Sequence, residues 1–153
     1  LVLATNTMHK VADAIQARTR IPLLHLGDTT ASAVRAAQVH RVGLLGTAFT
    51  MEQDFYVDRL RSHGLDVVVP PAEDRAEVHR VIYDELCRGQ VLDSSRDAYL
   101  EVIGRLADRG CTGVILGCTE IELLLPMAAA HGTPLFPTPR LHVAAAVDAA
   151  LAP

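Results

Sequence analysis

Short runs of apolar residues alternate with longer amphipathic segments along almost the whole chain. The short runs are almost uninterrupted in hydrophobicity, which is typical of strands that are buried on both faces. The longer segments repeat apolar residues at three- and four-residue spacing, as amphipathic helices do. We expect strands at residues 1–4, 21–26, 41–46, 66–69, 113–116 and 134–136. We expect helices at residues 7–18, 28–38, 51–63, 73–87, 94–109, 121–131 and 141–151, with Pro126 interrupting the sixth.

This alternation of strands and helices predicts an α/β fold, in which a parallel sheet lies between two layers of helices. In such sheets, ligands bind beyond the carboxyl ends of the strands. The residues that directly follow each expected strand are therefore the candidates for a functional site. These are residues 5–7, 27–29, 46–48, 70–71, 117–120 and 137–138.

The composition narrows the class of protein. With 153 residues, half of them hydrophobic, the chain can form one domain of ordinary size with a real core. A mild net charge of −4 and only 4% aromatic residues give no support for nucleic-acid binding. No apolar run approaches the length of a membrane span, and no secretory signal pattern stands at the start. We expect a cytoplasmic protein with no nucleic-acid or membrane partner.

The first residues affect how the whole chain is interpreted. Residues 1–4 (LVLA) have the pattern of a buried strand, and the sequence does not start with Met. Natural chains seldom start inside a core strand. We therefore expect that an upstream part of the protein is missing from this sequence.

The three cysteines are Cys87, Cys111 and Cys118, and none stands in a CxxC pair. An odd number at this spacing favours neither a disulfide framework nor a thiolate zinc site. Cys87, on a helix, and Cys111, before a strand, are expected to be structural. The histidines and carboxylates show no metal-ligand spacing, and there is no GxGxxG or Walker loop. We therefore expect neither a metal nor a nucleotide cofactor.

Cys118 is the leading candidate for a catalytic group. It follows a strand and precedes an expected helix, where unpaired N–H groups and the helix dipole favour a thiolate. A thiol whose pKa falls from about 8.5 toward neutrality can take or give a proton on carbon. Gly117 would let a ligand approach, Thr119 could bind a carboxylate, and Glu120 is costly to place at a sheet end. The alternative is a small buried cysteine at a strand terminus.

Polar residues follow two other strands in the same manner. Thr5, Asn6 and Thr7 offer hydroxyl and amide groups ahead of a helix, which suits either an anion site or ordinary helix capping. Thr47 and Thr50 follow the strand at residues 41–46. One of them is expected to cap the next helix while the other faces the cleft.

Three histidines lie near these segments. His9 falls early in a helix, where a solvent-facing or core-edge position is expected. His25 falls within an expected strand as a hydrogen-bonded core histidine. His142 opens the last helix, from where it could reach the cleft.

Three segments together resemble the aspartate/glutamate racemase family. They are residues 5–10 (TNTMHK), 43–51 (GLLGTAFTM) and 117–121 (GCTEI), in the family's order, and the resemblance covers nearly the whole chain. The family implies two pseudo-symmetric α/β lobes with the active site between them. It also implies two cysteines that exchange the substrate α-proton without pyridoxal phosphate or metal.

The resemblance also implies a division of this chain into lobes. Residues 1–39 and 135–153 would form a partial first lobe, and residues 40–134 an essentially complete second lobe. Cys118 matches the second family cysteine, whereas Thr5 stands at the position of the first.

Further roles follow from the same resemblance. Asn6 and Thr7 match residues that hold the carboxylate or amino group of the substrate. The remaining matched pocket positions are Thr47, Thr50, Thr119 and Glu120. Arg88, which stands before Gly89, loosely matches a basic residue that holds the distal carboxylate of aspartate-type substrates.

Thr5 leaves three functions open, because a hydroxyl is a far weaker acid than a thiol. The first is racemisation or epimerisation of an amino acid, with Cys118 moving the α-proton and Thr5 or a water relaying it. The second is isomerisation or decarboxylation of a dicarboxylate by one cysteine. The third is a small-carboxylate-binding module without turnover. In each case the partner is a small amino acid or carboxylate, with a homodimer as one option.

Overall fold

The computed structural model describes residues 1–152, which contain a five-stranded sheet in the order β2-β1-β3-β5-β4. The parallel strands are β1 (Arg41–Gly46), β2 (Asp66–Val68), β3 (Val114–Gly117) and β5 (Thr133–Pro137). Only β4 (Ala129–Ala130) is antiparallel to its neighbour, β5. The expected α/β fold with a mostly parallel sheet is therefore confirmed.

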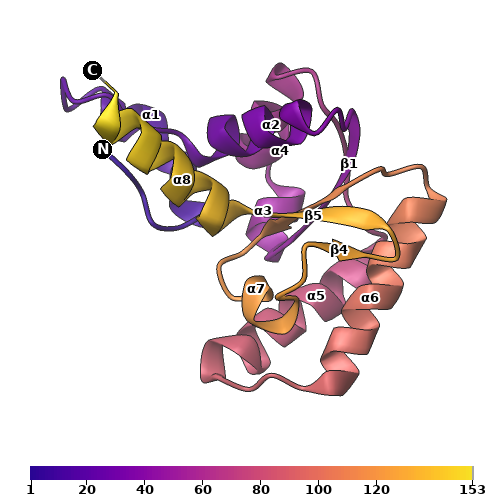
Figure 1. Cartoon of the computed structure of the whole chain (residues 1–153). Helices are drawn as coiled ribbons and strands as arrows, with labels where there is room; N and C mark the ends of the chain where they lie inside the picture. The colour runs from indigo at the N-terminus through magenta and orange to yellow at the C-terminus, as the bar shows by residue number, and fades with distance from the viewer. Residues whose placement is uncertain (153) are drawn as a thin grey trace.

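Helices cover both faces of this sheet (Figure 1). Helices α5 and α6 lie on one face, and α2, α4 and α8 lie on the other. The α-helices are α1 (Ala12–Gln16), α2 (Leu26–Ala36), α3 (Ala48–Glu52), α4 (Asp54–Ser62), α5 (Ala72–Asp84), α6 (Asp93–Asp108), α7 (Ile121–Leu124) and α8 (Thr138–Leu151). Two short 3-10 helices are η1 (Thr7–Val11) and η2 (Leu86–Arg88).

The central strands form the middle of the core. Every residue of β3 is buried, and Leu44 and Leu45 of β1 have no exposed surface. Apart from the exposed Arg41 at the start of β1, both strands are apolar, as expected for strands with helices on both faces. The carboxyl ends of β1 and β3 are level, since Gly46 pairs with Gly117. The loops after these two strands therefore emerge side by side.

The two strands expected before β1 are almost absent. In place of strands at residues 1–4 and 21–26, a single parallel bridge joins Val2 to Leu24. The Leu24 N–H donates to the Leu1 carbonyl at 2.9 Å. Both predictions are wrong in extent, because one bridge offers the backbone too few partners to form a ladder.

His25 ends the extended segment and begins a helix, so its predicted place inside a strand is wrong. Its backbone is extended, and its ring Nδ1 accepts a hydrogen bond from the Gly27 N–H at 3.0 Å. The side chain thus serves as an N-cap, a role usually taken by Ser, Thr, Asp or Asn. Helix α2 consequently begins at Leu26, before the expected start at Asp28.

Several helices differ from their expected bounds for local reasons. The helix expected at residues 51–63 is divided into α3 and α4, because Gln53 adopts an extended backbone. The helix expected at residues 121–131 stops after α7, since Pro126 supplies no backbone N–H and restricts the residue before it. The chain then forms the β4–β5 hairpin through a turn at His131 and Gly132, both with positive φ.

The sheet continues to Pro137, beyond the lobe boundary expected at residue 134. Strand β5 pairs with β3, so residues 133–137 share one sheet with β1 and β2. The division into two lobes stays a prediction.

In residues 1–152 no helix is long and apolar enough to cross a membrane, and no group of His, Cys, Asp and Glu is arranged to hold a metal ion.

Candidate functional site

Most of the expected site residues line one cavity of about 200 Å³. It lies at the carboxyl ends of β1 and β3, where parallel sheets bind ligands. The expected residues on its surface are Thr5, Asn6, Thr7, Thr47, Cys118, Thr119 and Glu120. The fold thus unites the loop before η1, the residue after β1 and the loop after β3.

Gly117 positions the Cys118 loop through close packing of two strands. A Cβ atom at Gly117 would lie 2.9 Å from the Leu45 carbonyl oxygen and 3.0 Å from Leu44 Cδ1. The glycine is therefore required by the approach of β3 to β1, whereas the sequence suggested that it makes room for a ligand. Cys118 is held at a fixed place because the strand before it cannot shift.

The thiol of Cys118 is in a different state from the one that the sequence predicts. Cys118 is only 9% exposed, and burial together with the Glu120 carboxylate raises its pKa to about 12. Helix α7 contains only Ile121–Leu124, so its dipole gives little opposing stabilisation. The prediction of a thiolate favoured by a helix N-terminus is wrong, and Cys118 is a neutral thiol at pH 7.

Glu120 is the hydrogen-bond partner of this thiol. The Cys118 Sγ–H donates to Glu120 Oε2 at 2.9 Å, and the Thr119 hydroxyl donates to the same oxygen at 2.5 Å. Burial raises the pKa of Glu120, but these two hydrogen bonds outweigh it and hold the pKa below its usual range. The cavity therefore contains a carboxylate beside a proton-bearing sulfur.

A second part of the cavity wall, called the Thr5 wall, is formed by Thr5, Asn6 and Thr7. Asn6 is 5% exposed, and its side chain does not cap η1, so ordinary helix capping does not explain it. Its Oδ1 atom is buried without a hydrogen-bond partner in the described chain. A buried acceptor without a donor is costly, which makes Asn6 Oδ1 a candidate to accept an N–H from a ligand.

Two expected site residues do not line the cavity. Thr50 is fully buried, with its hydroxyl oxygen 3.3 Å from that of Thr47, and neither side chain caps α3. Arg88 points to solvent beside Asp84, with the nitrogen and oxygen 3.6 Å apart. Neither Thr50 nor Arg88 lines the cavity, and a substrate contact for either residue stays a prediction.

Three further residues line the cavity that the sequence did not single out as functional. Ile82 and Tyr83 come from the last turns of α5, and Cys87 comes from η2. Cys87 was expected to be purely structural. The sequence carried no signal for these three residues, because the direction in which α5 crosses the sheet depends on its packing.

His142, expected as a residue that could reach the cleft, lines a smaller cavity of about 120 Å³. This cavity shares Thr5 and Thr119 with the larger one, and the rest of its wall is mostly apolar. The His142 Nδ1 lies 3.2 Å from the Thr29 hydroxyl, and its Nε2 is buried without a partner in the described chain. His142 therefore lines the neighbouring cavity, which shares Thr5 with the larger one, and does not line the larger cavity itself.

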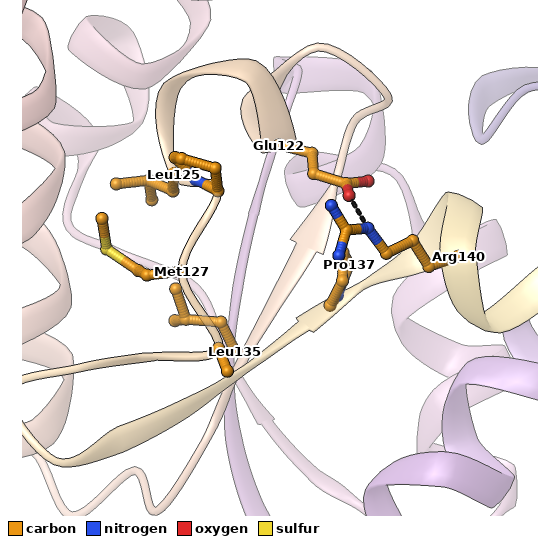
Figure 2. A pocket seen from close by; sticks show the side chains of 8 residues that line it. Glu122, Leu125, Met127, Leu135, Pro137 and Arg140 are labelled. Atoms are coloured by element: carbon orange, nitrogen blue, oxygen red, sulfur yellow. Dashed lines mark ion pairs between the residues drawn. The ribbon is translucent and has the colours of Figure 1, made fainter.

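A cavity of similar size on the other side of α7 lacks the groups that the first one has (Figure 2). Glu122 and Arg140 form an ion pair on one side of it, and Leu125, Met127 and Leu135 lie on the other side. It contains no cysteine, threonine or histidine among its lining residues. The Cys118 cavity is therefore the candidate active site.

Comparisons with known proteins agree with this assignment. A family model described as Asp/Glu/Hydantoin racemase matches residues 1–146. A glutamate racemase from Pseudomonas paraeruginosa is 30% identical over 133 residues, which are 84% of this chain and 48% of that protein. This chain thus spans about half the length of that relative.

Two crystal structures are similar to this chain over almost all of its length. A candidate Asp/Glu racemase from Yersinia pestis has 49% identity and a TM-score of 0.93, covering 99% of this chain and 66% of that one. An aspartate racemase homologue from Pyrococcus horikoshii OT3 has 33% identity and a TM-score of 0.89, covering 97% and 65%. From these matches and the shared fold, the chain belongs to the Asp/Glu/Hydantoin racemase family.

Proposed function

We propose that the Cys118 cavity binds an α-amino acid and exchanges its α-proton, so that the full protein racemises or epimerises amino acids without an organic cofactor. The observation that carries this proposal is the placement of Cys118 and Thr5–Asn6–Thr7 on one cavity. These segments lie far apart in the sequence, yet the fold brings a proton-bearing thiol and a polar wall to the same cavity. Such an arrangement can hold a substrate carbon between two faces.

The charges of the cavity favour an ammonium group. Glu120 supplies a carboxylate, and Asn6 Oδ1 supplies a buried acceptor without a donor. An α-ammonium carries three N–H donors and would satisfy both. The hydroxyls of Thr5 and Thr7 can then donate to the α-carboxylate and to the charge that develops when the α-proton leaves. The Thr119 hydroxyl can join them once it leaves Glu120.

Substrate binding also supplies a reason for Cys118 to act as a base. Burial and the Glu120 carboxylate raise the pKa of the thiol, so the thiolate is disfavoured while that carboxylate is unneutralised. A bound ammonium beside Glu120 neutralises the local negative charge and so lowers the pKa of Cys118. The Cys118 thiol first releases its own proton to water, and the thiolate then takes the α-proton from one face of the substrate and becomes a thiol again. On the Thr5 face the carbanion takes a proton from a water held by the Thr5 hydroxyl, or from that hydroxyl while a water reprotonates it. The hydroxide that remains takes up the proton that Cys118 released.

An acidic substrate would need a cation for its second carboxylate, and we assign this role to Arg88. Its ion pair with Asp84 is exposed on both sides, with 66% and 54% of the two side chains accessible. Exposed pairs of this kind contribute little free energy, so Arg88 can leave Asp84 at small cost. Cys87, the neighbour of Arg88, already lines the cavity.

The test is α-proton exchange into heavy water, followed by NMR with the full-length protein and a panel of L- and D-amino acids. We expect Cys118→Ser to lower the exchange rate at least about a hundredfold, the lower end of what a positioned acid/base contributes. Cys111→Ser is the matched control, because Cys111 is buried away from the cavity. Exchange that continues at the wild-type rate in Cys118→Ser would disprove the assignment.

A second candidate, a one-cysteine isomerase or decarboxylase acting on a dicarboxylate, is favoured by the protonated state of Cys118. Protonation of a carbanion from one face needs a thiol rather than a thiolate, and burial stabilises the thiol. Release of carbon dioxide, or cis/trans conversion without α-proton exchange of an amino acid, would identify this activity.

A third candidate, a carboxylate-binding module without turnover, is favoured by the hydroxyl of Thr5 in place of a second thiol. Calorimetry that shows amino-acid binding by the full-length protein, without exchange or product, would support it.

A further inference from the structure

His9 connects the Thr5 wall of the cavity to helix α2 through both of its ring nitrogens. It is 3% exposed, with Nδ1 2.8 Å from the Thr5 carbonyl oxygen and Nε2 3.1 Å from the Leu26 nitrogen. The Leu26 N–H can only donate, so Nε2 accepts and carries no proton. Nδ1 therefore carries the proton and donates it to Thr5. The two contacts fix His9 as a neutral imidazole of one tautomer.

The surroundings of His9 also oppose its protonation. Burial lowers the pKa of His9 and outweighs the backbone hydrogen bonds that raise it. Among the described residues, the charge that favours protonation is that of Asp28, which is already paired with Arg59. The ring of His25 lies edge-on at 4.7 Å and the ring of His142 at 5.8 Å. The neutral state is thus maintained by position as well as by hydrogen bonding.

The bond from His9 orients the peptide that joins Thr5 to Asn6. The peptide is trans, so its carbonyl and its N–H point to opposite sides. Because the Thr5 carbonyl faces His9, the Asn6 N–H is directed away from His9. Asn6 lines the cavity, and within residues 1–152 its N–H makes no hydrogen bond to another backbone group.

We propose that His9 is a positioning residue, which presents the Asn6 N–H and the Thr5 hydroxyl to the carboxylate of the bound amino acid. This rests on the proposed function of the cavity. The segment before the Thr5 wall has only one strand-like pairing in the described residues, the Val2–Leu24 bridge, so a sheet ladder does not fix this wall. A shift of this wall would move the substrate α-carbon relative to Cys118, and misplacement by about 1 Å can cost about a hundredfold in rate.

Two substitutions separate the contacts of His9. In His9→Asn, the amide nitrogen stands near the position of Nδ1 and can still donate to the Thr5 carbonyl, while the acceptor for Leu26 is lost. In His9→Gln, the amide oxygen stands near Nε2 and can still accept from the Leu26 N–H, while the donor to Thr5 is lost. The same two substitutions at exposed His40 are the matched controls.

The experiment measures kcat and KM for α-proton exchange together with thermal stability in the full-length protein. We expect His9→Gln to retain its melting temperature within a few degrees and to lose about tenfold or more in kcat with little change in KM. We expect His9→Asn to melt earlier and to keep kcat within about threefold of wild type. A wild-type kcat in His9→Gln would overturn the proposal. Losses of kcat that parallel the losses of melting temperature in both variants would also overturn it.

If the wild-type protein shows no exchange, the proposed function is refuted, but the role of His9 can still be tested. Calorimetry with the same amino acids then measures whether His9→Gln weakens binding more than His9→Asn. Nitrogen-15 NMR of the His9 ring gives a readout that is independent of turnover. We expect the Nδ1–H tautomer, and an Nε2–H tautomer or a protonated ring at pH 7 would overturn the proposal.

Discussion

The two walls of the candidate active site are held in place by different means. The Cys118 wall follows β3, a buried strand with partners on both sides in the sheet. The Thr5 wall follows a segment with one backbone bridge and is positioned by the ring of His9. The first wall therefore depends on backbone packing, and the second depends on side chains that can titrate. We expect packing changes to perturb the Cys118 wall, and changes of pH to perturb the Thr5 wall.

The largest effect is expected from crowding the Cys118 wall. Gly117→Ala places a methyl group 2.9 Å from the Leu45 carbonyl oxygen, and such overpacking costs about 1–3 kcal/mol. Gly104→Ala is the matched control, because Gly104 lies within α6 with open space around its Cβ position. The control should gain about 0.5–1 kcal/mol from helix propensity. Urea denaturation measures both, and equal stability of the two variants would contradict the packing account.

A smaller effect is expected from removing the charge beside the thiol. Glu120→Gln takes away the carboxylate that helps to raise the pKa of Cys118, while burial continues to raise it. The pKa should fall from about 12 without reaching its ordinary value. Alkylation of Cys118 at pH 8 should become about tenfold faster, as expected for about one pKa unit. Glu73→Gln, on the exposed start of α5, is the control; an unchanged alkylation rate in Glu120→Gln would show that Glu120 does not restrain the thiol.

The smallest effect concerns the acid side of the pH profile. Burial, with help from His9 and Arg59, lowers the pKa of His25 from 6.5 to about 4. Between these pH values the unfolded chain binds more protons than the folded chain. The contribution of His25 to the free energy of unfolding therefore has its full value above pH 6.5 and falls as the pH is lowered. His25→Asn keeps an N-cap acceptor and should remove roughly 1 kcal/mol of the loss that occurs between pH 6.5 and 5.5.

Melting temperatures recorded across this range check the prediction. The slope should decrease in His25→Asn without vanishing, because burial also lowers the pKa of His9 and His142. A slope identical to that of wild type would show that His25 does not titrate in this range.

The sequence predicted the sheet well because its strands are buried on both faces, and a continuous apolar run then identifies them. It predicted the N-terminal strands poorly, since the apolar pattern at residues 1–4 and 21–26 does not reveal how many backbone partners each segment finds. The helix at residues 121–131 failed for a reason visible in the sequence, namely Pro126. The apolar periodicity continues past Pro126, but the missing N–H of this proline prevents the helix from continuing with it.

The cavity could be predicted only in part. Cys118 could be identified because it directly follows a parallel strand, and parallel strands end on a common edge. Thr5 was identified by the same rule, although the strand expected before it is reduced to one bridge. Tyr83 and Cys87 reach the cavity from helix ends, and their direction depends on how α5 packs on the sheet. The protonation state of Cys118 was predicted in the wrong direction, since the sequence shows neither the burial of the sulfur nor the orientation of Glu120 toward it.

The short outer strands of the sheet bear on how copies of this chain can aggregate. Edge strand β2 has three residues and is followed closely by Pro70 and Pro71, and edge strand β4 has two residues and ends in the His131–Gly132 turn. Short edges that end at a proline or a sharp turn offer few free backbone N–H and C=O groups for pairing with an incoming strand. Fibril-like growth of the sheet is therefore disfavoured at both edges. Any self-association of the folded chain would take place through helices and loops, and so would leave the strands of the sheet in their present order.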